Sequence, residues 1–152
     1  MTSELYQNGL IGFQLVLLTW IVLHDLRTLI VPNRYVYPAI VASLVAIAPL
    51  GLGVMTNVWL GAVATFAVML AVAIVGRGAM ALGDTKVGAF CGAIVGLQGI
   101  VPMLTLTFIG GGLISLGLVA ARVRHRSDAI AFTPFLLIAV VATLLMLGGP
   151  SA

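Results

Sequence analysis

Long apolar stretches, separated by short polar or glycine-containing breaks, make up most of this chain. A helix that crosses a bilayer needs roughly 20 predominantly apolar residues, and six stretches approach that length, some of them barely. They cover about residues 9–23, 36–54, 59–75, 84–97, 101–121 and 129–147. The pattern predicts an all-α, polytopic membrane helix bundle of about six transmembrane helices, with residues 1–152 forming a single membrane-embedded domain.

The composition supports a membrane protein and excludes several other classes. Of the 152 residues, 62% are hydrophobic and 7% are charged, whereas a soluble domain carries about 25% charged residues. A chain this short cannot bury so many apolar side chains in a water-exposed globule. A soluble enzyme, a disordered tail and a nucleic-acid binder are therefore excluded, and the net charge of +3 reflects basic loops rather than a phosphate-binding surface.

The basic residues are confined to alternate connections between the predicted spans. Arg27 and Arg34 lie between the first two stretches, and Arg77 and Lys86 lie around the junction of the third and fourth. The other three basic residues, Arg122, Arg124 and Arg126, lie between the last two stretches. The connections at 51–57 and 98–99 and the tail after residue 147 carry no charge. Basic loops face the cytoplasm, so we expect both termini on the non-cytoplasmic side, with the lipid bilayer as the immediate environment.

The sequence offers little support for a metal or an organic cofactor. Cys91 is the single cysteine, and His24 and His125 are far apart and each adjoins charged residues. None of the ligand spacings of zinc sites occurs. We therefore expect a protein that works without a cofactor.

Two of the four acidic residues are candidates for chemistry. Asp25 closes the first apolar stretch and Asp84 opens the fourth, so both are expected at the cytoplasmic surface, whereas Glu4 and Asp128 suit solvated or loop positions. Two facing carboxyl groups can share one proton. One then activates water while the other hydrogen-bonds a scissile carbonyl, as in an aspartic protease. Alternatively, each aspartate caps a helix or pairs with a loop arginine.

The surroundings of the two aspartates resemble those in a known family. Asp25 begins DLRTLIVPN, Asp84 lies in ALGDTK, and the last stretch contains IAFTPFLLIA. Together they resemble the type IV prepilin peptidases, the GxGD-type membrane aspartic peptidases that include the preflagellin peptidases. The family pattern is an aspartate followed by an I-P-N turn, then G-x-G-D-x-K at a later helix start, then an apolar–Gly–Pro–Phe segment. The resemblance implies that Asp25 and Asp84 are catalytic.

Four further residues belong to these motifs. Pro32 breaks the helix after Asp25, and Asn33 can hold the turn with its side chain. Gly83 either permits close approach at the helix start or is an ordinary loop glycine. Lys86 either steadies the ionised form of Asp84 or extends to the membrane interface.

The chain also departs from the family pattern at two positions. Ala81 stands where G-x-G-D has its first glycine, and Thr133 stands where glycine often precedes the proline. Thr133 and Pro134 suggest a helix start with a capping threonine, or a kink in a longer helix. Because no cysteine-rich amino-terminal segment is recognisable, the resemblance is to the short, peptidase-only branch.

A stripe of small residues follows Asp84. Gly88, Gly92 and Gly96 recur every four residues, and small residues let membrane helices pack closely. We expect this stripe to dock the fourth helix against a neighbour and to keep Asp84 inside the bundle.

The resemblance implies a membrane aspartic endopeptidase in the cytoplasmic (inner) membrane of a prokaryote, with its active site at the cytoplasmic face. Its partner would be a prepilin-like or preflagellin-like precursor, from which it removes a short cytoplasmic leader. Two alternatives remain open. One is a small proton- or cation-coupled transporter, whose site would be expected near the bilayer midplane at a broken helix. The other is a non-catalytic assembly factor of a pilus or secretion machine.

Overall fold

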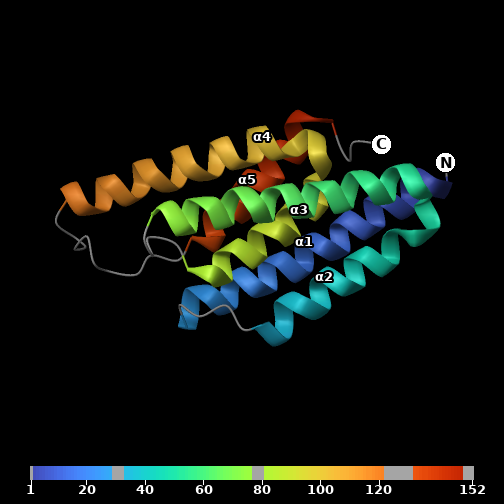
Figure 1. The fold of residues 1–152 in the computed structure, drawn as a ribbon, viewed down its shortest axis with the longest axis horizontal. Coiled ribbons are helices and arrows are strands. Elements are labelled where there is room, and N and C mark those ends of the chain that lie inside the picture. Colours follow the sequence, from blue (N-terminus) through green and yellow to red (C-terminus); the bar gives the residue numbers. More distant parts are fainter. Residues whose placement is uncertain (1, 29–32, 77–80, 122–131, 149–152) are drawn as a thin grey trace.

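The structure is a computed structural model that describes residues 2–28, 33–76, 81–121 and 132–148. Every regular element in these residues is helical. The elements are α1 (Thr2–Thr28), α2 (Asn33–Ile47), a 3₁₀ turn η1 (Ala48–Leu50), α3 (Leu52–Val75), α4 (Leu82–Ala120) and α5 (Thr133–Met146). They form a bundle in which most helices run side by side (Figure 1). The predicted all-α fold is therefore confirmed.

The helix α4 consists of two helices joined at a break. Gly96 has φ 65° and ψ −178°, which lie outside the helical region, and glycine adopts a positive φ at little cost because it has no Cβ. In Figure 1 the chain runs along α3, turns near this point and returns in the opposite direction. The halves 82–95 and 97–120 correspond to the predicted stretches 84–97 and 101–121, with the break at Gly96 rather than at 98–99.

Two other predicted boundaries were wrong. The expected connection at 51–57 is almost entirely helical, because Gly51 alone, at φ 95°, separates η1 from α3. The first helix begins at Thr2 rather than near residue 9. An apolar stretch marks only the part of a helix that avoids water, and polar residues such as Glu4 and Gln7 can continue the same helix beyond it.

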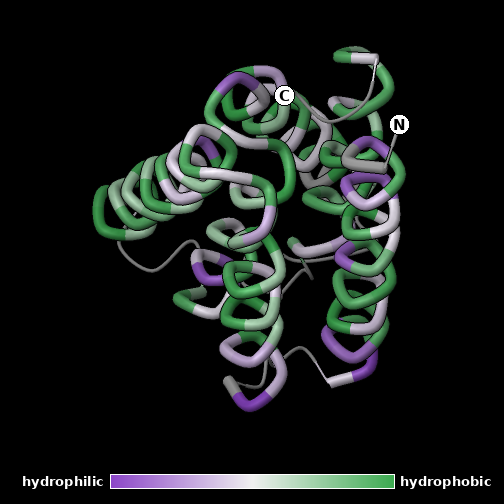
Figure 2. The backbone as a smooth tube through the Cα atoms, turned by 90° about the vertical axis from the view of Figure 1, so that its right-hand side faces the viewer, coloured by the Kyte–Doolittle hydropathy of each residue, from purple (hydrophilic) through white to green (hydrophobic). Residues whose placement is uncertain are grey.

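The surface of the bundle suits a lipid environment. Three helical segments are long and apolar enough to cross a membrane, namely Glu4–Thr28, Leu52–Val75 and Leu82–Ile114. Hydrophobic residues line most of each helix (Figure 2), and large apolar side chains such as Val75 and Leu145 are 82% and 78% exposed. So much exposed apolar surface is costly in water, which marks the chain as a membrane protein. The six spans and their orientation stay predictions.

Helices α3 and α4 are held together by the predicted glycine stripe. Gly88, Gly92 and Gly96 of α4 face Met69, Thr65 and Asn57 of α3 respectively. Gly92 also lies directly against Gly61 of α3, backbone to backbone. The expectation that the stripe docks the fourth helix is confirmed.

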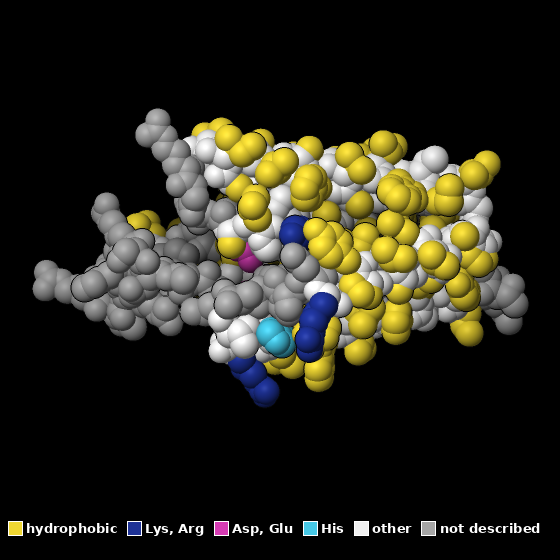
Figure 3. Space-filling model, turned by 60° about the horizontal axis from the view of Figure 1, so that its bottom comes forward, with side chains coloured by type: hydrophobic (Ala, Val, Ile, Leu, Met, Phe, Trp, Pro, Cys, Tyr) yellow, Lys and Arg dark blue, Asp and Glu magenta, His cyan; other side chains and the backbone are white. Residues whose placement is uncertain are grey.

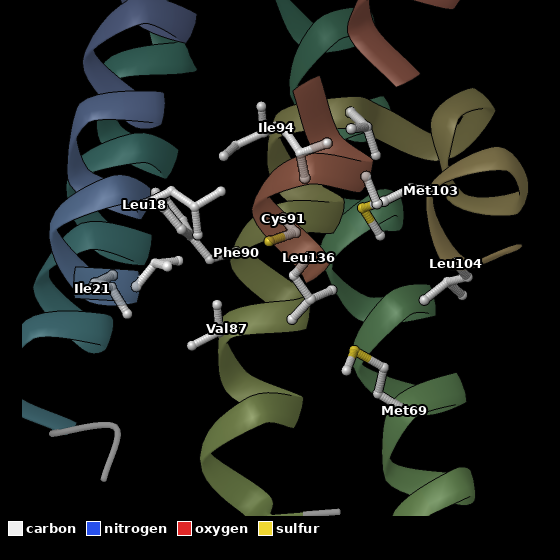
Figure 4. Close-up of a cluster of buried hydrophobic side chains, with 14 of the residues drawn as sticks. Leu18, Ile21, Met69, Val87, Phe90, Cys91, Ile94, Met103, Leu104 and Leu136 are labelled. Atoms are coloured by element: carbon white, nitrogen blue, oxygen red, sulfur yellow. The ribbon is translucent and has the colours of Figure 1, made fainter. Parts of the chain in front are cut away.

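The core joins four helices around the first half of α4. The fully buried side chains include Leu18 of α1, Met69 of α3, Phe90 and Met103 of the two halves of α4, and Leu136 of α5. In Figure 4 they converge with Val87 and Cys91 between the helices. This packing fixes the ends of α1, α4 and α5 relative to one another.

Candidate active site

Three helix ends meet at one end of the bundle. The carboxyl end of α1 and the amino ends of α4 and α5 all lie at this end (Figure 1). They carry Asp25, Asp84 and Thr133, whose exposed fractions are 4%, 8% and 0%. Residues 108 positions apart in the chain thus form one buried polar cluster.

Asp25 is held by a hydrogen bond from α5. The Thr133 hydroxyl donates to the Asp25 Oδ2 over 2.6 Å, and both groups are buried. A donor that is itself buried restrains the carboxylate more than water would, because solvent competes little for it.

Asp84 occupies the first turn of α4. Its backbone N–H donates to the Ala81 carbonyl over 3.1 Å, which begins the first turn of the helix. Ala81 itself is exposed, so its methyl group does not crowd this turn.

The two carboxyl groups lie at the same end of the bundle. Both are buried, one near the end of α1 and the other in the first turn of α4, and these two helices are in contact. The structure therefore brings the two predicted catalytic residues together, which their spacing of 59 positions in the sequence did not require.

The four supporting residues of the motifs do not all lie at the start of α4. Asn33 is the first residue of α2, Pro32 lies outside the described residues, and Gly83 is partly exposed in the first turn of α4. The Lys86 ammonium lies over the Tyr37 ring of α2, 5.1 Å from its centroid. Lys86 thus links α4 to α2, an interaction that the sequence did not reveal.

An aromatic and basic group joins α1 to α2 beside the aspartates. The His24 ring meets the Tyr35 ring edge-on at 5.6 Å, and Arg34 lies over the same ring at 5.0 Å while donating to its hydroxyl over 2.9 Å. In Figure 3, basic side chains, a histidine and an acidic side chain lie close together near the middle of this face, and apolar side chains cover most of the described surface to their right. The end of the bundle that carries the aspartates is the one expected to face the cytoplasm.

The cluster has the composition needed for acid–base chemistry with water. One carboxylate can take a proton from water while a protonated neighbour donates a hydrogen bond to a carbonyl oxygen. Among the described residues there is no group of three or more His, Cys, Asp or Glu side chains that could hold a metal ion.

A small, mostly apolar cavity lies at the other end of the bundle. The cavity, of about 40 Å³, room for a few water molecules, opens between α1, α3 and the break in α4. Gln7, Gln14, Asn57 and Gly96 line it, and Asn57 Oδ1 accepts the Leu97 N–H over 2.9 Å. Within the described part of the chain its lining includes no ionisable side chain.

The sequence analysis did not predict two contacts that the structure shows. Thr133 was expected to cap α5 or to mark a kink, but the residue before the helix is Phe132 and no side chain caps it. Asn57 was placed in a connection, but it lies in α3 and caps the second half of α4. The sequence features that could have indicated these two contacts were a threonine in place of a glycine and a lone asparagine beside an apolar stretch.

Comparisons with known proteins agree on one family. The sequence profile of the type IV leader peptidase family matches residues 12–148. The chain is 29% identical over 133 residues to a prepilin leader peptidase/N-methyltransferase of Aeromonas hydrophila. It is 30% identical over 138 residues to the protein of the same name from Aeromonas salmonicida (strain A449). Each alignment covers 82% of this chain and 46% of the relative, so the chain spans about half the length of these relatives. No solved structure matches it significantly.

Proposed function

The chain belongs to the type IV leader peptidase family, and we propose that it is a membrane aspartic endopeptidase that uses Asp25 and Asp84. Its substrate is a type IV prepilin-like or preflagellin-like precursor. The single observation that carries this proposal is the burial of the two motif aspartates at the same end of the bundle, near the end of α1 and at the start of α4.

The reaction is hydrolysis of one peptide bond. One aspartate, as carboxylate, removes a proton from water, and the water oxygen attacks the scissile carbonyl carbon. The other aspartate, protonated, hydrogen-bonds the carbonyl oxygen and stabilises the negative charge that develops there. Collapse of the tetrahedral intermediate breaks the C–N bond, and the leaving nitrogen takes the proton that the first aspartate removed from water. The products are a free carboxylate and a free amine.

The position of the pair suits a substrate that is itself a membrane helix. Asp84 lies in the first turn of α4, and Asp25 lies three residues before α1 ends at Thr28. Both are therefore at one end of the helices, where a leader peptide in the cytoplasm meets the apolar segment that follows it. The neighbouring basic residues Arg27, Arg34 and Lys86 support a cytoplasmic location for this end.

The transporter alternative receives weaker support. Its expected signature, a broken helix, does occur at Gly96, beside a mostly apolar cavity that three polar side chains also line. The described cavity lining nevertheless lacks the carboxylate that proton coupling requires, and both buried aspartates lie at the other end of the bundle.

The test is cleavage of a prepilin-like precursor by purified protein in detergent micelles, with Asp25→Asn, Asp84→Asn and the double variant. Each single variant should lower kcat by at least about 100-fold, because acid–base groups contribute 10²–10⁴-fold. The double variant should be no worse than either, since the two act as a unit. Glu4→Gln, which alters an exposed carboxylate on α1, is the matched control and should cleave normally.

Mass spectrometry of the products identifies the bond that is cut, and loss of cleavage in the identically purified aspartate variants excludes a contaminating protease. Cleavage by the purified chain alone would also eliminate a purely non-catalytic assembly role. Full activity of either aspartate variant would refute the catalytic assignment.

A further inference from the structure

A buried threonine connects the start of α5 to the carboxylate near the end of α1. We propose that Thr133 is a positioning residue for Asp25, fixing the orientation of the carboxylate through its hydroxyl group. The inference rests on the proposed function for its catalytic consequence, but the contact itself is a feature of the fold.

The Thr133 hydroxyl is available because the start of α5 does not need it. A threonine at a helix start commonly accepts a hydrogen bond from an unpaired backbone N–H. Here Pro134 has no N–H, and the Phe135 N–H donates to the Phe132 carbonyl over 3.1 Å. The hydroxyl instead donates away from its own helix, to Asp25 Oδ2.

The surroundings make this hydrogen bond consequential. Thr133 is fully buried and Asp25 nearly so, and the Phe132 ring packs between those of Phe108 and Phe135 at centroid distances of 5.8 and 6.3 Å. Hydrogen bonds to charged groups are strong where water is excluded, and a buried acceptor that loses its donor is destabilised.

The contact makes the two oxygens of Asp25 inequivalent. Because Oδ2 accepts the Thr133 hydroxyl, rotation of the carboxylate is restricted. The other oxygen, Oδ1, is then the one that exchanges protons with water and with Asp84. A group held in one orientation needs less reorganisation as the transition state forms.

The side chain that forms this contact departs from the family pattern, which often has glycine at the position of Thr133. Glycine has no side chain to offer. The chain therefore adds a hydroxyl group, carried by α5, to a pair of carboxylates carried by α1 and α4.

The experiment compares Thr133→Val, which keeps the shape and removes the hydroxyl, with Thr133→Ser, which keeps the hydroxyl. Thr107→Val is the matched control, because Thr107 is also a buried threonine but donates to Met103 of its own helix over 2.8 Å. Prepilin cleavage gives kcat, KM and the pH profile. The infrared difference between ¹³C-aspartate-labelled protein with Asp25 and the same labelled protein with Asp25→Asn isolates the Asp25 carboxylate band independently of activity, because Asp84 and Asp128 carry the label in both.

We expect Thr133→Val to lower kcat by about 10- to 100-fold, the equivalent of one charged hydrogen bond, with KM within about twofold. Its pH profile should shift, its carboxylate band should move, and Thr133→Ser should restore both. Thr107→Val should match the wild type in every respect. If Thr133→Val does not fold by circular dichroism, Thr133→Ala makes the same deletion.

Two results would overturn the inference: wild-type kcat and an unmoved band in Thr133→Val, or a folded Thr133→Ser as impaired as the valine variant. Failure of the proposed function has a different signature. The wild type would then not cleave, or Asp25→Asn would cleave normally, and the infrared band alone would decide whether Thr133 holds Asp25.

Discussion

The close approach between two helices at Gly92 of α4 and Gly61 of α3 offers a sharp test of the fold. A Cβ added at Gly92 would overlap the Gly61 carbonyl and come within 2.7 Å of the Thr65 Cβ. A backbone carbonyl cannot rotate away, and a β-branched side chain has few alternative rotamers. Gly92→Ala must therefore push α3 and α4 apart.

The magnitude follows from two opposing effects. Overpacking a well-packed interior costs about 1–3 kcal/mol, whereas replacing glycine by alanine in a helix gains up to about 1 kcal/mol. Gly112→Ala, also in α4, meets nothing within 4 Å and shows the helix gain alone. The difference between the two variants isolates the steric cost, which should be about 1–3 kcal/mol.

A third substitution, at Gly88, should have an intermediate effect on stability. At Gly88 an added Cβ would overlap the Met69 Sδ, part of a flexible side chain that can adopt another rotamer. The melting temperature of Gly88→Ala should therefore lie between those of Gly92→Ala and Gly112→Ala. The assay is thermal unfolding in one detergent, followed by circular dichroism, with a shift of about 2–4 °C for each kcal/mol in a chain of this size. If Gly92→Ala and Gly112→Ala have the same melting temperature, α3 and α4 do not pack as the structure shows.

The remaining predictions concern the break in α4 and the topology. Asn57→Ala removes the acceptor of the Leu97 N–H and should destabilise the protein by about 1–3 kcal/mol, seen as a lower melting temperature. Thr56→Ala, its exposed neighbour on α3, should change stability by less than about 0.5 kcal/mol, and equal effects would contradict the capping role. A reporter active only in the cytoplasm should give signal when fused after Arg124 and none after Ala152. The reverse pattern would put both aspartates on the wrong side for a cytoplasmic leader.

The candidate site shows where sequence reasoning succeeds and where it stops. Asp25 and Asp84 could be selected because an ionisable group beside an apolar stretch is costly unless it has a purpose. Their surrounding motifs named a family that the comparisons bear out. The partner of Asp25 could not be selected, because Thr133 lies 108 residues away and its own neighbourhood suggested a helix cap.

The same division applies to the fold. Apolar length determined that the chain forms membrane helices, because each segment must satisfy its backbone hydrogen bonds within itself. The recurrence of Gly88, Gly92 and Gly96 determined that one face of α4 packs closely. Which helix meets that face, and that Asn57 caps the break at Gly96, depended on the tertiary structure. These contacts join segments that are far apart in the sequence, and no local sequence pattern predicts which segments pair. They are therefore decided only when the helices pack into the bundle.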